Sequence, residues 1–247
     1  MTGFIRAVLV FLVVTGLPVQ VGAQQVSRYS GPCDASAAVA LDAGHFVVGD
    51  DEHNTLYIYR RGQAQAVASL NLSKFLDTGA DRESDIEGAA AIGQRIYWIT
   101  SHGRDGKGKA RPARHRFFAT EVLPGNPPAL KPVGEPYTRL LHDMQESAVL
   151  RPYRLGDAAR LAAEADGGLN IEGLAATPEG TLLIGLRNPL PQQRALLIPL
   201  ENPGEVITGR PARFGTPIEL DLGRRGIRSI ERVGESYLIA AGPTADS

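Results

Sequence analysis

The tripeptide Ile-Glu-Gly occurs twice in the chain, and each copy places a carboxylate at the start of a short apolar run. Glu87 lies in SDIEGAAAI and Glu172 lies in LNIEGLAAT. Carboxylates suit Ca²⁺, which takes six to eight oxygen ligands. The alternative is that each acid accepts hydrogen bonds from backbone N–H groups of its own loop. The repeated motif therefore makes Glu87 and Glu172 candidate metal ligands, with Ca²⁺ as the candidate ion.

Both copies belong to a recurring pattern of short β-prone runs separated by Gly, Asp, Asn and Pro. Four such runs in about 40 residues are the size of one β-propeller blade. The predicted strands are 37–41, 45–49, 55–60, 66–70, 86–92, 95–100, 117–123, 171–176, 181–186, 195–200, 217–222, 227–233 and 236–241. We predict an all-β propeller of about three blades and half of a fourth. Since propellers usually have about 4–8 blades, we expect the single domain, residues 24–247, to be truncated at its C-terminus.

A section with the residue spacing of helices interrupts the β pattern. Residues 137–147 and 155–165 carry Leu and Ala at three- and four-residue spacings, which is typical of helices. The sequence predicts a short helical insertion at about 137–166 on one blade. It also predicts that the Pro-rich residues 124–136 form a connecting loop.

The repeats predict where polar side chains gather. In a blade the innermost strand runs antiparallel to its neighbour, so the start of the first and the end of the second share one sheet edge. This rule places Asp85 and Glu87 beside Ser101 and His102, Asn170 and Glu172 beside Arg187 and Asn188, Asp34 and Ser36 beside Asp50 and Asp51, and Arg228 beside Gly242. We expect a polar funnel at the mouth of the central channel, a concave place that suits a ligand.

This funnel would offer oxygen ligands to a cation and donors to an anion. The candidate metal ligands are Glu87, Glu172, Asp34, Asp50, Asp85 and Asn170. The candidate residues for a small anionic ligand are Ser101, Arg104, Lys107, Lys109, Arg187, Asn188 and Arg228. Arg and Lys are natural partners of phosphate and carboxylate groups. Two alternatives stay open: residues 104–116 form a solvated hairpin loop, and Arg187 neutralises Glu172 across its strand pair.

His102 is the candidate general acid or base, and its alternative role is a hydrogen bond at a strand end. Ser101 and His102 are adjacent on a strand and point to opposite faces, so they make a poor nucleophile–base pair. The patterns G-x-S-x-G and H-E-x-x-H do not occur. The sequence therefore favours a binding module for a small anion or a structural cation. The alternative is a metal-assisted hydrolase of phosphate esters or lactones, in which Glu87 and Glu172 hold the cation and His102 moves protons.

Residues 1–23 have the pattern of a secretory signal peptide. An apolar run at 7–14 follows a short basic start, and Val21-Gly22-Ala23 offers the small residues of a cleavage site. We expect a periplasmic or extracellular protein with no membrane attachment after signal removal. The formal net charge of −1 gives no reason to expect nucleic acid. Cys33 is the only cysteine, so no internal disulfide forms, and we expect it to be buried. The sequence does not indicate an oligomeric state.

Several co-ordered motifs resemble those of the bacterial domain-of-unknown-function 3616 family. They are CDASAAVAL with GDDEHNTLYIYRR, DIEGAA with SHGRDGKGKARPARHRFF, and NIEGLA with IGLRNPL. The resemblance covers most of the chain after the signal peptide, and it implies no particular activity. A weaker similarity is to phytase-like and lactonase-like propellers, in which a Glu-Gly pair at the start of inner strands supplies a metal ligand. That similarity implies that Glu87 and Glu172 bind calcium.

Overall fold

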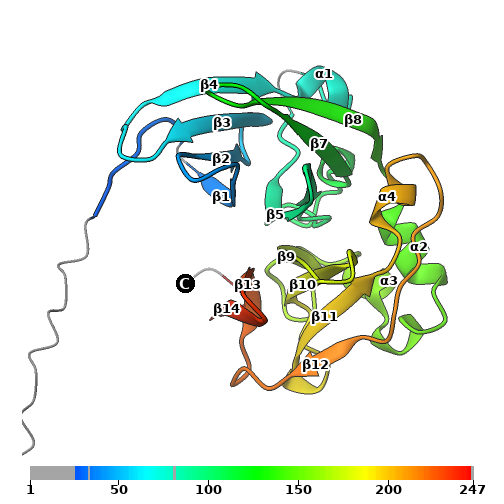
Figure 1. Ribbon diagram of the computed structural model, residues 1–247. Coiled ribbons are helices and arrows are strands. Elements are labelled where there is room, and N and C mark those ends of the chain that lie inside the picture. The colour runs from blue at the N-terminus through cyan, green and yellow to red at the C-terminus, as the bar shows by residue number, and fades with distance from the viewer. Residues whose placement is uncertain (1–25, 33, 80–81, 246–247) are drawn as a thin grey trace, which may run out of the picture.

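The computed structural model describes residues 26–32, 34–79 and 82–245. The predicted signal peptide and Cys33 lie outside this described part of the chain. The described residues form a mostly β protein with three four-stranded antiparallel sheets and one two-stranded sheet (Figure 1). None of the helices in these residues is long and apolar enough to cross a membrane.

Each sheet is built from strands that are consecutive in the chain. The first sheet contains β1 (Ala35–Ala40), β2 (His45–Asp50), β3 (Thr55–Arg60) and β4 (Ala66–Asn71), and the second contains β5 (Ile86–Ile92), β6 (Arg95–Thr100), β7 (Phe117–Leu123) and β8 (Ala129–Tyr137). The third contains β9 (Asn170–Ala176), β10 (Leu182–Asn188), β11 (Ala195–Leu200) and β12 (Ile218–Leu220), and the last contains β13 (Gly226–Val233) and β14 (Ser236–Gly242).

The sheets follow one another around an arc in a propeller-like arrangement (Figure 1). The first strand of each sheet is innermost: β5 lies beside both β1 and β9, and β9 lies beside β13. The outer strands β4, β8 and β12 lie at the periphery. The prediction of a mostly β protein with antiparallel sheets arranged as in a propeller is therefore confirmed. Within the described residues the arc does not close into a ring.

The predicted Pro-rich loop is wrong, because most of it forms β8 at the outer edge of the second sheet. β8 contains Pro132 and Pro136 and pairs with β7 alone. An edge strand tolerates proline, because the side that faces away from the sheet needs no N–H donor. The proline content masked the strand in the sequence.

Short helices occupy the section where the sequence predicted them, and they are shorter than the pattern suggested. In this section lie α2 (Leu140–Glu146), a 3₁₀ turn at Arg151–Tyr153 and α3 (Leu155–Ala158). Elsewhere lie α1 (Ser73–Leu76), α4 (Pro203–Val206) and 3₁₀ turns at Pro112–Arg114 and Pro191–Gln193. Leu140, Met144 and Leu155 are buried in the same apolar cluster as Ile184 of β10. The helical section is therefore packed onto the core of the third sheet.

The isoleucine and the glycine of the Ile-Glu-Gly motif have the same structural roles in the second and third sheets. Ile86 and Ile171 are completely buried. A Cβ atom added to Gly88 would lie 3.0 Å from the Cβ atom of Leu174 on β9, and one added to Gly173 would lie 3.0 Å from Ile227 on β13. The glycines therefore allow each inner strand to approach the next one closely, and the isoleucines fill the core.

Candidate functional site

Each inner hairpin carries a β-bulge near the same end, and the bulges select the residues of the site. Ile86 and Gly88 pair with the adjacent residues Thr100 and Ile99, so Glu87 has no opposite partner in the ladder. The same kind of register shift places Ser36, Glu172, Arg187 and Arg228 at bulges of their hairpins. A bulge bends the strand and re-aims the side chain of the extra residue. All five bulged residues line one cavity.

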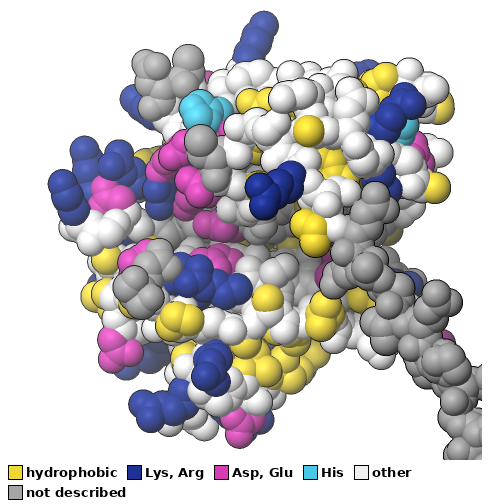
Figure 2. Space-filling model, turned by 90° about the vertical axis from the view of Figure 1, so that its left-hand side faces the viewer, with side chains coloured by type: hydrophobic (Ala, Val, Ile, Leu, Met, Phe, Trp, Pro, Cys, Tyr) yellow, Lys and Arg dark blue, Asp and Glu magenta, His cyan; other side chains and the backbone are white. Residues whose placement is uncertain are grey.

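This cavity, which we call the funnel, has a volume of about 550 Å³ and a polar wall. Its acidic residues are Asp34, Asp51, Asp85, Glu87, Glu164 and Glu172. Its basic residues are Arg104, Arg114, Arg187 and Arg228. Figure 2 shows a face of the molecule on which acidic side chains gather around a hollow and basic side chains flank them. The funnel therefore presents both signs of charge to a ligand.

Three carboxyl groups from two blades meet in the funnel, and we call them the acid cluster. Asp51, Asp85 and Glu87 each contribute an oxygen atom, and these atoms all lie within 4.8 Å of one another. Burial, together with the charges of Asp85, Glu172 and Asp51, raises the pKa of Glu87 to about 10. Burial likewise raises the pKa of Asp51 to about 6. Glu87 of the acid cluster therefore retains its proton at neutral pH when no cation is bound.

Asp85 of the acid cluster has an arginine partner. Arg114 Nη1 lies 3.0 Å from Asp85 Oδ2, and Nη2 of the same guanidinium pairs with Glu83. Burial still raises the pKa of Asp85 because it outweighs the opposing effect of Arg114. One guanidinium thus offsets only part of the negative charge that the three carboxyl groups carry when ionised.

The opposite part of the funnel is organised around Glu172. Its Oε1 accepts hydrogen bonds from Arg187 Nη1 at 2.9 Å and Asn170 Nδ2 at 3.0 Å, and its Oε2 lies 3.8 Å from Arg228 Nη1. The second candidate metal ligand is therefore already neutralised by arginines, as the alternative reading of Arg187 expected. Asn170 is 5% exposed, and its Oδ1 has no hydrogen-bond partner among the described residues.

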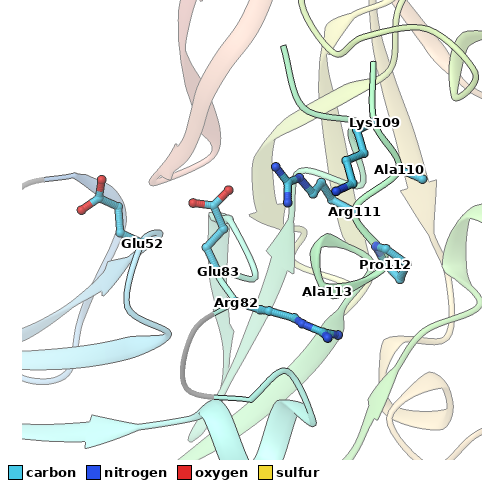
Figure 3. A pocket seen from close by; sticks show the side chains of 8 residues that line it. All are labelled: Glu52, Arg82, Glu83, Lys109, Ala110, Arg111, Pro112 and Ala113. Carbon is cyan, nitrogen blue, oxygen red and sulfur yellow. The ribbon is translucent and has the colours of Figure 1, made fainter. Parts of the chain in front are cut away.

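The basic loop is divided between two cavities. Arg104 lines the funnel and is fixed by hydrogen bonds to the carbonyl oxygens of Ala159 and Gly108, both at 2.9 Å. Lys109 lines a neighbouring cavity of about 510 Å³, in which Figure 3 shows it beside Arg111. Lys107 lines neither cavity. Of the candidate residues Arg104, Lys107 and Lys109, Arg104 lines the funnel, and Arg114 of the same loop lines it as well.

Three other predicted site residues hydrogen-bond to backbone atoms and do not line the funnel. Asp50 Oδ1 accepts hydrogen bonds from the backbone nitrogens of Glu52 and His53, at 3.0 and 3.2 Å, so its carboxylate closes the β2–β3 turn. Asn188 Nδ2 donates to the carbonyl oxygens of Ala163 and Ala165, and Ser101 Oγ accepts from the Gly103 nitrogen. None of Asp50, Ser101 and Asn188 lines the funnel.

His102 is buried behind the funnel wall. Its Nδ1 donates a hydrogen bond of 2.8 Å to the Thr100 carbonyl oxygen, and Nε2 has no partner among the described residues. Burial lowers the pKa of His102 to about 3, with a further contribution from His115. The imidazole is therefore neutral at ordinary pH, and it does not line the funnel.

The structure adds Asp51, Ser36, Arg114 and Glu164 to the candidate ligand residues, of which Ser36 and Asp51 were already expected at this sheet edge. Asp51 takes the place in the funnel that the candidate set gave to Asp50, one position earlier. Asp50 is engaged by the turn nitrogens of Glu52 and His53, and a bulge at Ser36 shifts the register between β1 and β2 at this point. Ser36 Oγ then donates a hydrogen bond of 3.2 Å to Asp51 Oδ2. Alternation along a regular strand does not reveal such a shift.

Fold and site together define a mostly β protein of propeller-like arrangement with a charged funnel at one end of its inner strands. The chain belongs to the family described as "Protein of unknown function (DUF3616)", whose model matches residues 34–120 and 138–247. The resemblance seen in the motifs is thereby confirmed. No functionally curated protein matches the sequence.

Two solved structures are similar to this chain over most of its length. The glutaminyl cyclase of Myxococcus xanthus is 15% identical, with a TM-score of 0.44, over 88% of this chain and 66% of the cyclase. The Cps50 (Swd1) β-propeller domain of Myceliophteria thermophila is 12% identical, with a TM-score of 0.41, over 83% of this chain and 51% of the domain. The chain thus spans less than two thirds of either solved structure.

Proposed function

We propose that the protein is an exported binding module that holds a divalent cation in its funnel, at the acid cluster of Asp51, Asp85 and Glu87. The carrying observation is that oxygens of these three residues converge within 4.8 Å. Asn170 lines the same cavity, and its buried Oδ1, without a hydrogen-bond partner among the described residues, is a second, independent oxygen of a type suited to a cation. A buried polar atom without a partner carries a desolvation cost that a bound ion or its water removes.

The donor chemistry favours Ca²⁺ among the common cations. All four groups supply oxygen, which hard cations prefer, and no histidine or cysteine joins the acid cluster among the described residues. Zn²⁺ prefers sites with nitrogen or sulfur ligands. Mg²⁺ demands strict octahedral geometry, whereas Ca²⁺ accepts flexible sites built from separate segments. The acid cluster draws on a turn of the first sheet and on the start of β5 in the second, which fits the more tolerant ion.

Metal-assisted hydrolysis receives less support from the geometry. His102, the predicted proton carrier, is neutral and lies behind the wall, and Glu172 is engaged by two arginines. A general acid or base must reach the proton that it transfers. The hydrolase hypothesis therefore loses the proton carrier that it assigned, and binding is the function that the wall residues support best.

A thermal melt with Ca²⁺ or with chelator tests the proposal. Ca²⁺ at a hundredfold excess over Kd stabilises the folded protein by about 2.7 kcal/mol. Glu87→Gln removes one carboxylate ligand and keeps the size and shape of the side chain. Glu146→Gln, at an exposed position of α2, is the matched control.

We expect the Ca²⁺ shift in the parent protein and in Glu146→Gln, and its loss in Glu87→Gln. Equal shifts in all three proteins, or no shift in any, would refute the cation site. A parallel assay with p-nitrophenyl phosphate separates binding from hydrolysis. Calcium-dependent turnover that Glu87→Gln abolishes would replace the binding module by the enzyme.

A further inference from the structure

The acid cluster alone cannot complete the coordination of a calcium ion. Ca²⁺ takes six to eight oxygens, and the cluster supplies carboxyl groups from three residues. The funnel has a volume of about 550 Å³, which is within the range of cavities that hold small molecules. The remaining coordination positions therefore face a space large enough for a ligand that carries oxygen atoms of its own.

The arginines of the funnel wall supply a complementary charge. Arg187 and Arg228 both interact with Glu172, so two guanidinium groups of the wall lie around one carboxylate. Arg104 adds another guanidinium, and the hydrogen bonds to Ala159 and Gly108 fix its orientation before any ligand arrives. Fixed guanidinium groups lose little entropy when they bind carboxylate or phosphate.

We infer that the funnel binds a small oxyanion, with a phosphate or carboxylate group, that bridges a calcium ion at the acid cluster and the arginines Arg104 and Arg228. This inference rests on the proposed function, because the ion must occupy the acid cluster first. One end of the anion completes the coordination of the ion, and the other end meets the positive part of the wall.

A bridging ligand makes the two binding events interdependent. Without the ion, the anion would face the carboxyl groups of Asp51, Asp85 and Glu87, and with the ion it faces a cation. Coupling between two ligands is reciprocal, so Ca²⁺ tightens the binding of the anion by the same factor as the anion tightens the binding of Ca²⁺. We expect this factor to be at least about tenfold, which corresponds to about 1.4 kcal/mol.

Isothermal titration calorimetry on the purified protein measures this coupling. The probes are inorganic phosphate and succinate, each titrated with Ca²⁺ and with chelator, at concentrations that keep calcium phosphate in solution. Arg228→Gln removes one arginine of the wall. Arg225→Gln, at an exposed position just before β13, is its matched control. Arg104→Gln tests the second arginine of the proposed bridge, and it replaces Arg228→Gln if that variant does not fold.

The expected result is that at least one probe binds ten times more tightly with Ca²⁺, and that Arg228→Gln or Arg104→Gln loses this gain while Arg225→Gln keeps it. The probe that binds distinguishes a phosphate from a carboxylate ligand. Binding that is equal with Ca²⁺ and with chelator would overturn the bridge. Calcium binding without either anion would overturn this inference and leave the proposed function intact, and absence of calcium binding would overturn both.

Discussion

The ion pair between Glu172 and Arg187 gives the sharpest prediction about stability. The side chains are 7% and 4% exposed, and their polar atoms are 2.9 Å apart. Glu172→Gln keeps the size and one acceptor oxygen of the side chain and removes its charge. The buried guanidinium of Arg187 then faces a neutral amide in place of a carboxylate.

The expected loss follows from the partners that survive. Removing one member of a buried pair costs about 3–5 kcal/mol. The amide oxygen introduced by Glu172→Gln would still accept a hydrogen bond, and Arg187 Nε also donates to the Pro243 carbonyl oxygen at 3.1 Å. We therefore expect a smaller loss, about 2–3 kcal/mol, which lowers Tm by roughly 4–12 °C for a protein of this size.

Thermal and urea unfolding followed by circular dichroism measure the effect. Glu179→Gln, exposed in the turn between β9 and β10, is the control and should not change Tm. The double variant Glu172→Gln/Arg187→Met should lose less than the sum of the two single losses, because the two side chains interact directly and each single substitution already removes that interaction. Additive losses, or equal behaviour of Glu172→Gln and Glu179→Gln, would show that this pair does not stabilise the fold.

Three further predictions concern the surroundings of the funnel. His102 has its pKa lowered from 6.5, so its own contribution to stability should fall by roughly 2 kcal/mol between pH 7 and 5, whereas the raised pKa of Glu87 acts in the opposite direction. His102→Asn, which tolerates the φ of +55°, should therefore be less destabilised than the parent by acidification over this range, in urea melts of the two proteins side by side. Gly226→Ala would place a Cβ 1.8 Å from the Arg187 carbonyl oxygen and should cost roughly 1–3 kcal/mol, whereas Gly106→Ala meets nothing within 4 Å and should melt like the parent. Asn54→Gly keeps the φ of +51° and removes a buried amide that holds the segment before β5, so we expect a loss of about 1–3 kcal/mol and weaker Ca²⁺ binding by calorimetry.

The positions of the inner hairpins could be predicted from the sequence because alternation and turn residues are local signals. β6 and β11 have the predicted bounds, and the two Ile-Glu-Gly motifs lie at equivalent places in their sheets. The strand β8 could not be predicted in this way, because its prolines act as breakers everywhere except at a sheet edge. Local pattern thus identifies a strand better than its place in the sheet.

The sequence predicted at which sheet edge the candidate site lies, but it predicted less well which side chains face the cavity. Glu87, Glu172, Arg187 and Arg228 line the funnel. Which other side chains join them depends on register shifts and on tertiary burial, as the imidazole of His102 shows: it lies in the predicted region and is turned into the protein. A repeated motif predicts the neighbourhood, and only packing decides which groups face the ligand.

The bulges of the inner hairpins have a consequence for how this fold can change during evolution. Equivalent bulges hold Ser36, Glu87, Glu172 and Arg228, so a hydroxyl, two carboxylates and a guanidinium already occupy one structural position in four repeats. Because a bulged residue has no side chain directly opposite, cross-strand pairing restricts its identity little. Substitutions at these positions change the charge and ligand preference of the funnel while the hydrogen-bonded ladder stays intact. The fold can therefore be kept while the ligand preference of the funnel changes, and a few substitutions at the bulged positions are enough to redesign that preference.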